Sequence, residues 1–197
     1  MRSRLRSAAA AAIVLVVPGL LQAQVAGPPV TIRDLEGLRV RDQVRTPDYD
    51  YSTNIPDSPT RAREWVRLMT EYETTPEWID ELSFRYFALA LKTEGSKREF
   101  TLFRGTVTYA DIPEDRDHLS VMFLRPRAVE RYGEIVAIAV EISHGGNVVA
   151  ARSEAKPKLP EKWWTNPQLT PRDGYLLNRL QTPFAFINYD DYEFIKK

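Results

Sequence analysis

The sequence predicts an all-β fold, an antiparallel β-sandwich of seven or eight strands with one short helix at about 126–132. Short runs rich in Val, Ile, Phe, Tyr and Thr recur between turn residues through the middle of the chain, a spacing typical of sandwiches. The sequence contains no heptad run, internal repeat or low-complexity tract. The 174 residues after an N-terminal leader favour one domain that buries about 68–70% of its unfolded surface.

The first 23 residues have the features of a secretory signal peptide. Three arginines precede an apolar run from Ala8 to Val17, and small residues follow up to Ala23. Counted from Ala8 through Leu21, the apolar segment has 14 residues without a charge, which is short of the roughly 20 that span a bilayer as a helix. We therefore expect cleavage after Ala23, export to the periplasm or cell surface, and no membrane span after cleavage.

Charge and cysteine content exclude several classes of function. Without residues 1–23 the chain has 24 basic and 27 acidic side chains, a formal charge of −3. This balance gives no general attraction to nucleic acid or to anionic lipid. The absence of cysteine excludes thiolate metal sites, redox motifs and cysteine nucleophiles.

An N-terminal strand and a linker are predicted between residues 24 and 60. In "GLRVRDQV", Leu38, Val40 and Val44 fall on one side of an extended chain, and Asp42 interrupts that side. The next stretch, "TPDYDYSTNIPDSP", contains three prolines and small polar residues that indicate a surface linker. Its Tyr49 and Tyr51 share one side if the linker is extended.

The predicted sandwich occupies residues 61–197 and begins with two strands. "REWVRLMTEYE" places Val66, Leu68, Thr70 and Tyr72 on one face. A helix from Ser58-Pro59 is the alternative, but Thr74-Thr75-Pro76 closes the run with turn residues, and "LSFRYFALAL" follows as a central strand.

Three local patterns mark the middle of the sandwich. Gly105 within "EFTLFRGTVTYA" predicts a bulge or kink. Pro126 and Gly133 bracket the short helix. Gly145-Gly146 between "EIVAIAVEI" and "NVVAARSE" predicts a two-residue hairpin turn.

No catalytic or metal-binding constellation is evident. His118 and His144 are 26 positions apart, and both are expected at the surface. A triad of Ser120, His144 and an aspartate lacks any nucleophile-elbow sequence. The acidic loop "ADIPEDRD" does not fit an EF-hand and is expected to be solvated. We therefore predict no enzyme activity, no catalytic residue, no metal and no cofactor.

Aromatic residues provide the candidate binding surface. Trp163 and Trp164 lie in a proline-interrupted connection, and together with Tyr49 and Tyr51 they could present rings to a sugar or a protein. Adjacent residues of an extended chain point to opposite sides, so one tryptophan is expected to be buried. Phe184 and Phe186 share a face by the same rule, which predicts a C-terminal segment packed on the sandwich.

Two long segments carry a resemblance to a known family. "WVRLMTEYETTPEWIDELSFRYFALAL", a later "WW", and "DGYLLNRLQTPFAFINYDDYE" resemble small exported proteins encoded beside type IV pilus genes in Verrucomicrobia, including Akkermansia. "GYLLN" and "TPFA" are the most specific parts. The resemblance implies an immunoglobulin-like sandwich that can oligomerise, and it implies no catalytic residues.

The expected function is that of a non-enzymatic envelope protein, an accessory or assembly factor of type IV pilus-like structures. A pilin keeps its apolar N-terminal helix after processing, whereas the apolar segment here has the features of a signal peptide that is cleaved off. We therefore expect that this protein is not a filament subunit. Partners would be proteins of the envelope or pilus machinery, or further copies of this chain, and no nucleic acid. The alternative is a secreted module that binds carbohydrate such as mucin glycans.

Overall fold

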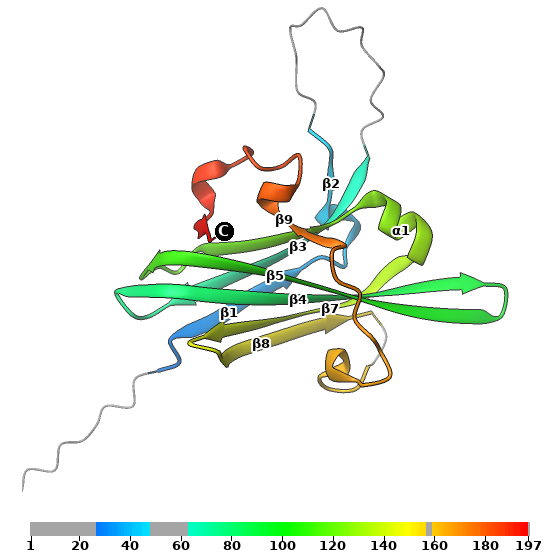
Figure 1. Cartoon of the computed structure of the whole chain (residues 1–197), viewed down its shortest axis with the longest axis horizontal. Coiled ribbons are helices and arrows are strands. Elements are labelled where there is room, and N and C mark those ends of the chain that lie inside the picture. Colours follow the sequence, from blue (N-terminus) through cyan, green and yellow to red (C-terminus); the bar gives the residue numbers. More distant parts are fainter. Residues whose placement is uncertain (1–26, 48–62, 157–158, 197) are drawn as a thin grey trace, which may run out of the picture.

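The computed structural model describes residues 27–47, 63–156 and 159–196, and within them the chain forms a sandwich of two antiparallel sheets (Figure 1). Seven strands have seven residues or more, and three are shorter. The strands are β1 (Val30–Glu36), β2 (Gln43–Arg45), β3 (Glu64–Thr74), β4 (Trp78–Glu94), β5 (Lys97–Pro113), β6 (His118–Leu124), β7 (Glu134–His144), β8 (Asn147–Ala155), β9 (Leu176–Asn178) and β10 (Phe194–Ile195). The all-β prediction is confirmed.

The sheet that we name sheet A has the order β1-β3-β6-β9, and β2 also pairs with β3. The sheet that we name sheet B has the order β10-β5-β4-β7-β8, with β4 at its centre as predicted. Since β1 and β2 belong to sheet A, the predicted boundary near residue 60 does not separate them from the sandwich. The immunoglobulin-like class stays a prediction. The predicted signal peptide lies outside the described residues.

Local sequence signals account for the helix and the turns. Helix α1 spans Pro126–Tyr132, with Pro126 in its first turn and Gly133 as its C-cap. Gly145 and Gly146 both have positive φ and join β7 to β8. Four 3₁₀ turns complete the described elements: η1 (Val40–Asp42), η2 (Trp163–Thr165), η3 (Arg179–Gln181) and η4 (Tyr189–Asp191). Within the described ranges, no helix has the length and apolar character needed to cross a membrane.

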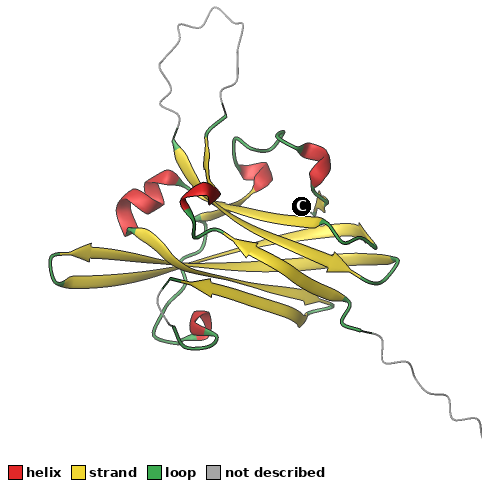
Figure 2. Cartoon of the chain, turned by 180° about the vertical axis from the view of Figure 1, so that it is seen from behind, coloured by secondary structure: helices red, strands yellow, loops and turns green. Residues whose placement is uncertain are grey.

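Among the described residues, the buried apolar side chains form three clusters rather than one. The largest fills the space between the sheets and includes the β3 residues Val66, Leu68 and Tyr72, which confirms the strand prediction for this segment. A second cluster lies on the outer face of sheet B, beneath η2. A third joins Val121 and Phe123 of β6 to Phe184 of the C-terminal segment. Figure 2 shows the short helical turns lying outside the two sheets.

Most strand edges are protected. Arg152 of β8 donates to the carbonyl of Arg33 in β1 and lies 3.2 Å from the Asp34 carboxylate. The outer edge of β5 pairs with β10. Further along the same edge, two backbone hydrogen bonds join β5 to Arg172. Edge strand β6 pairs with β9, and the Val121 amide donates to the Tyr109 hydroxyl. At the tip of the β4–β5 hairpin, residues 92–94 and 97–99 pair only with each other. The tip is charged, and charge is a common protection of such edges.

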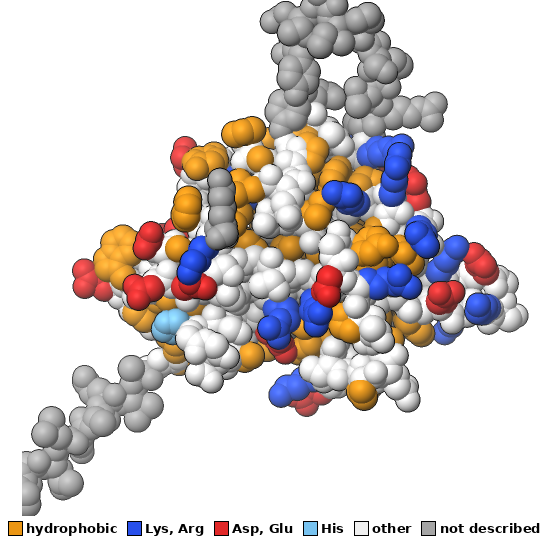
Figure 3. Space-filling view, in the orientation of Figure 1, with side chains coloured by type: hydrophobic (Ala, Val, Ile, Leu, Met, Phe, Trp, Pro, Cys, Tyr) orange, Lys and Arg blue, Asp and Glu red, His pale blue; other side chains and the backbone are white. Residues whose placement is uncertain are grey.

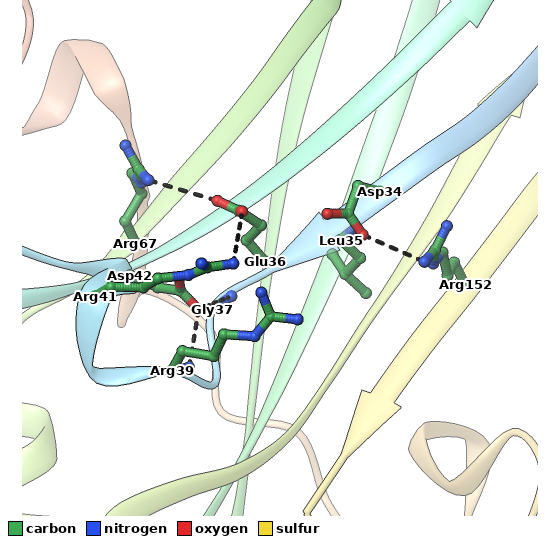
Figure 4. A network of polar contacts seen from close by, with 9 residues as sticks. All are labelled: Asp34, Leu35, Glu36, Gly37, Arg39, Arg41, Asp42, Arg67 and Arg152. Carbon is green, nitrogen blue, oxygen red and sulfur yellow. Dashed lines mark hydrogen bonds and ion pairs between the residues drawn. The ribbon is translucent and has the colours of Figure 1, made fainter.

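The segment after β1 differs from the prediction of a continuous strand. The chain turns at Gly37 and forms η1, so Val40 is exposed, while Asp42 is only 2% exposed. The Asp42 carboxylate accepts hydrogen bonds from the amides of Gly37 (2.9 Å) and Arg39 (2.8 Å), as Figure 4 shows. Alternation predicted the wrong side for Val40 because a 3₁₀ turn does not alternate.

Gly105 does not form the predicted bulge. It pairs in regular register with Tyr86, and the strand crosses Leu176 of β9 at close range. A Cβ at Gly105 would lie 2.6 Å from the Leu176 Cβ and 2.7 Å from the Met122 Cε. The glycine is therefore required by the close approach of another strand.

We expect Gly105→Ala to lower the free energy of unfolding by about 1–3 kcal/mol, the usual cost of an added methyl group in a packed core. Urea unfolding followed by circular dichroism measures this. Gly27→Ala is the matched control, because a Cβ there meets nothing within 4 Å. Equal stability of the two variants would contradict the close approach.

Candidate functional site

The C-terminal segment covers the outer face of sheet A and is held by one buried arginine. Arg179 is buried and donates to the carbonyl oxygens of Ile187 (2.9 Å), Asn188 (3.2 Å) and Tyr189 (3.4 Å). Its guanidinium also lies over the ring of Tyr192, 4.4 Å from the centroid. A planar group with several donors suits this role. The segment is thereby folded back on itself.

Two further contacts fix the segment to β6 and β3. Thr182 is buried and donates to the Arg179 carbonyl at 2.7 Å, and its hydroxyl accepts from the Phe184 amide. The Phe184 ring stacks on Phe123 at 4.6 Å and meets Trp65 edge-on at 5.7 Å. The "TPFA" part of the sequence thus forms the attachment point. Burial raises the pKa of Tyr192, which lies in the same layer.

Phe186 corrects the prediction that it shares a buried face with Phe184. Its side chain is 81% exposed. The amides of Ala185 and Ile187 donate to the carbonyls of Thr182 and Phe184, so the chain turns here and the alternation of an extended strand does not apply. The C-terminal segment is therefore buried at Phe184 and exposed at Phe186.

The outward side of this segment carries an apolar surface that we name the C-terminal patch: Leu180, Phe186, Ile187 and Tyr189, all exposed. Figure 3 shows hydrophobic side chains on this side of the molecule, where Figure 1 draws the C-terminal segment in orange and red. Asp190 and Asp191 follow directly, are exposed, and make no ion pair in the described part of the chain. Apolar side chains rimmed by charge are typical of protein interaction sites.

The predicted binding residues do not form an exposed surface together. Trp163 and Trp164 are both buried, at 5% and 7% exposed, although only one was expected to be. They lie in a 3₁₀ turn, so the alternation of an extended chain does not separate them. Trp164 donates to Glu141 of β7 at 2.9 Å. Tyr49 and Tyr51 lie outside the described residues.

An apolar groove of about 500 Å³ adjoins this turn. Leu89, Phe100, Leu159, Trp163 and Leu169 contribute to its wall. The Trp163 indole nitrogen is buried and has no hydrogen-bond partner in the described structure.

The two histidines occupy different environments, and the prediction that both lie at the surface is wrong for His118. That ring is 4% exposed and stacks on Tyr72 at 4.9 Å. Its Nδ1 lies 2.9 Å from a Glu193 carboxylate oxygen and its Nε2 lies 3.0 Å from the Pro113 carbonyl oxygen. These contacts tie the C-terminal segment to the start of β6.

His144 is exposed at the end of β7 and lines an open polar hollow of about 510 Å³. It makes no hydrogen bond or ion pair with any described residue. Ser120, the other member of the triad considered from sequence, is buried beside Tyr86 in the core. The two residues are not brought together.

The acidic loop is bound to β1 rather than arranged around a cation. Asp117 forms a 2.7 Å ion pair with Arg33, and Asp115 accepts from the Arg116 amide. Across the described residues, no three His, Asp or Glu side chains are placed to hold a metal ion.

Sequence reasoning missed Arg179 and the role of Asp42 as a hydrogen-bond acceptor for the turn after β1. Both roles depend on turns that no periodic pattern indicates. The one available signal was the density of specific residues around "GYLLNRLQTPFA", which the structure places in β9, η3 and the attachment of the C-terminal segment.

Comparison with known proteins places this fold in a family. A crystal structure of a protein from Akkermansia muciniphila is similar, with 23% sequence identity and a TM-score of 0.69 over 88% of this chain and 97% of that chain. This likeness concerns the fold alone. No curated protein sequence matches the chain. A family model matches residues 31–197, which include both sheets except the first residue of β1, and the chain belongs to the family that this model describes.

Proposed function

We propose that the protein is a non-enzymatic, exported envelope protein that acts as an accessory or assembly factor of type IV pilus-like surface structures. The observation that carries this proposal is the C-terminal patch. Phe186 and Tyr189 are 81% and 58% exposed on a segment that Arg179 and Phe184 hold firmly. A fixed aromatic surface is suited to recognition, because ordering it on binding costs little entropy.

The contacts favour a face of the protein over a strand edge as the contact surface. At one edge of each sheet a short strand, β9 or β10, is already paired, and at the other edges β1 and β8 contact each other through Arg152. A partner strand at β5 or β6 would have to displace β10 or β9. The C-terminal patch requires no such rearrangement.

The residues around the patch define the chemistry of the partner. Asp190 and Asp191 lie beside the aromatic side chains without ion-pair partners among the described residues. An apolar partner surface bordered by Lys or Arg would complement both features. The resemblance of the sequence to proteins encoded with pilus genes points to a component of that machinery.

Affinity purification from the native envelope in mild detergent tests the proposal. The tagged protein should recover pilus components, and a Phe186→Ser/Tyr189→Ser variant should recover at least about ten-fold less, as loss of a hot-spot pair implies. Val148→Ser is the matched control, because Val148 is 55% exposed on β8, away from the patch.

Recovery of no pilus component by the unaltered protein would overturn the proposal. Equal recovery by the patch variant and the control would overturn the patch as the contact surface. Recovery of further copies of this chain alone, with loss in the patch variant, would instead identify a self-association surface and remove the pilus role.

Glycan binding through Trp163 and Trp164, the second function predicted from sequence, has no exposed ring to support it. Both side chains are buried against sheet B. We do not propose it for those residues.

A further inference from the structure

The outer face of sheet B carries a polar hollow that the proposed function does not use. Its volume is about 510 Å³, within the range of small-molecule sites. The side chains that matter for its chemistry are Asp80, Glu81, Ser83, Arg85, Thr106 and His144. It lies on the opposite sheet from the C-terminal patch.

Strand register places these side chains in rows. Glu81 of β4 pairs with Ala110 of β5, which pairs with Phe194 of β10. Two residues along β4, Ser83 pairs with Thr108, whose carbonyl accepts from the Lys196 amide. Neighbouring strands lie about 4.8 Å apart, so each row forms a continuous strip across three strands.

A third row continues the strip. Arg85 lies between Thr106 of β5 and Glu141 of β7. The Arg85 side chain is half exposed and its ion pair with Glu141 is long, 3.7 Å. Its remaining donors are therefore free to meet a ligand.

The contacts already made within the hollow leave other groups available. The Ser83 and Thr108 hydroxyls lie 2.9 Å apart, and Glu81 pairs with Lys196. Asp80 and His144 contact no described hydrogen-bond or ion-pair partner. Acceptors, donors and hydroxyls thus stand side by side at the surface.

The balance of charge selects the ligand. Asp80 and Glu81 disfavour an anion, and Arg85 and Lys196 disfavour a cation. A hydroxyl-rich neutral ligand can donate to the carboxylates and accept from the cations at the same time, which satisfies both sets of groups. Sugars have this property.

An aromatic side chain lies on the same outer face, beyond the lining of the hollow. Phe194 is 62% exposed, and it lies on the outer face because the next residue, Ile195, points into the core. Ala110 of β5 separates it from Glu81, a distance of about 10 Å at two strand spacings that a short oligosaccharide can span. A ring in this position can cover the apolar face of a pyranose while the polar strip binds its hydroxyls.

We propose that this hollow binds a short neutral oligosaccharide, with Phe194 as the stacking surface and with Asp80, Arg85 and His144 as hydrogen-bonding groups. The site is independent of the proposed pilus role, since it uses a different face and different side chains. Either proposal can fail without the other.

Nuclear magnetic resonance of the whole labelled protein tests this inference with maltohexaose, cellohexaose, triacetylchitotriose and N-acetyllactosamine as probes. At least one probe should shift backbone signals of residues 80–85, 106–108 and 143–146, with a dissociation constant in the millimolar range. Asp80→Asn, Arg85→Ala and Phe194→Ala should each weaken that binding about ten-fold, the effect of losing one well-formed contact.

Matched controls separate the two surfaces. Glu77→Gln changes an exposed carboxylate outside the hollow, and Phe186→Ala removes an exposed ring from the other sheet, so neither should alter sugar binding. Asp80→Asn removes no contact among the described residues. The variant should therefore fold normally, and a loss of sugar binding in it would be a direct effect on the hollow.

The inference is overturned if no probe shifts these signals, if the shifts map to the Trp163 groove, or if the three variants bind as tightly as the unaltered protein. Stronger binding of inorganic phosphate or of spermidine in the hollow would also overturn the assignment to a neutral ligand.

Discussion

Raising the pH above about 10 is expected to unfold the protein, because three tyrosines of the core resist ionisation in the folded state. Tyr72, Tyr86 and Tyr109 are buried between the sheets. Burial raises the pKa of each one, and that of Tyr109 reaches about 12. In the unfolded chain a tyrosine ionises near pH 10.

The sign of the effect follows from proton binding. Above pH 10 the unfolded chain loses phenolic protons that the folded chain retains, so the unfolded state becomes favoured as the pH rises. Stability from this source is complete below about pH 10. It then falls by about 1.4 kcal/mol per pH unit for each tyrosine, up to the pKa in the folded state.

The surroundings of the three hydroxyls explain why ionisation is costly. The Tyr86 hydroxyl lies 2.7 Å from the Thr70 hydroxyl and 3.0 Å from the Ser120 carbonyl oxygen, which can only accept. The Tyr109 hydroxyl accepts from the Val121 amide at 3.2 Å. The Tyr72 hydroxyl has no hydrogen-bond partner in the described structure. Loss of water around a phenolate is the largest cause of the raised pKa at each of the three tyrosines.

Urea unfolding at a series of pH values between about 8 and 12, with tyrosinate absorbance as a second readout, measures this. Tyr72→Phe is the matched control. It removes an unpaired hydroxyl, so stability at neutral pH should be unchanged or higher, while the loss of stability above pH 10 should be less steep. A free energy of unfolding that stays constant up to pH 11 would contradict the prediction.

The sequence was most informative where neighbouring residues determine the structure. The Gly145-Gly146 turn, the Pro126 start and the Gly133 end of α1 depend on backbone preferences of single residues, and all are confirmed. The strand from Glu64 to Thr74 is confirmed because one of its faces is buried throughout, which leaves a clear alternation.

Prediction failed where a turn replaces an extended chain. Val40, Trp163 and Phe186 all lie in or beside short turns. The alternation of an extended strand therefore wrongly predicted that Val40 and Phe186 are buried and that only one of Trp163 and Trp164 is. His118 was misplaced for another reason. Its burial depends on Glu193 and Pro113, which approach it only in the folded protein.

The candidate surfaces could be predicted only in part. The aromatic density of the C-terminal segment was visible, but its division into a buried Phe184 and an exposed Phe186 depends on the turn that follows Thr182. The polar hollow was not visible, since its residues come from three strands and the β7–β8 turn and are far apart in the sequence.

Replacing Arg179 with methionine is expected to release the C-terminal segment from sheet A. Three carbonyl groups, at Ile187, Asn188 and Tyr189, would lose their donor. In the described part of the chain no carboxylate lies within ion-pair distance of Arg179, so its charge is balanced by these carbonyl dipoles and by the rings of Tyr189 and Tyr192. We expect a loss of about 3 kcal/mol, as for removing one member of a buried charged network.

Arg179→Lys should restore only part of this stability, because an ammonium group cannot serve three carbonyls from a planar fork. Arg131→Met is the matched control, since Arg131 also lies over a tyrosine ring, 5.0 Å from Tyr132, but at the exposed end of α1. It should change stability by less than about 0.5 kcal/mol.

Hydrogen exchange distinguishes release of the segment from global unfolding. If Arg179 acts as a clamp, residues 179–195 should exchange faster in Arg179→Met while the β4 and β7 amides keep their protection. Phe184 would then leave Phe123 and Trp65, and the C-terminal patch would lose its fixed geometry. Capture of partners through the patch should fall together with the hydrogen-exchange protection of residues 179–195. A variant that loses this protection and still captures partners would show that the patch does not depend on the contacts of Arg179.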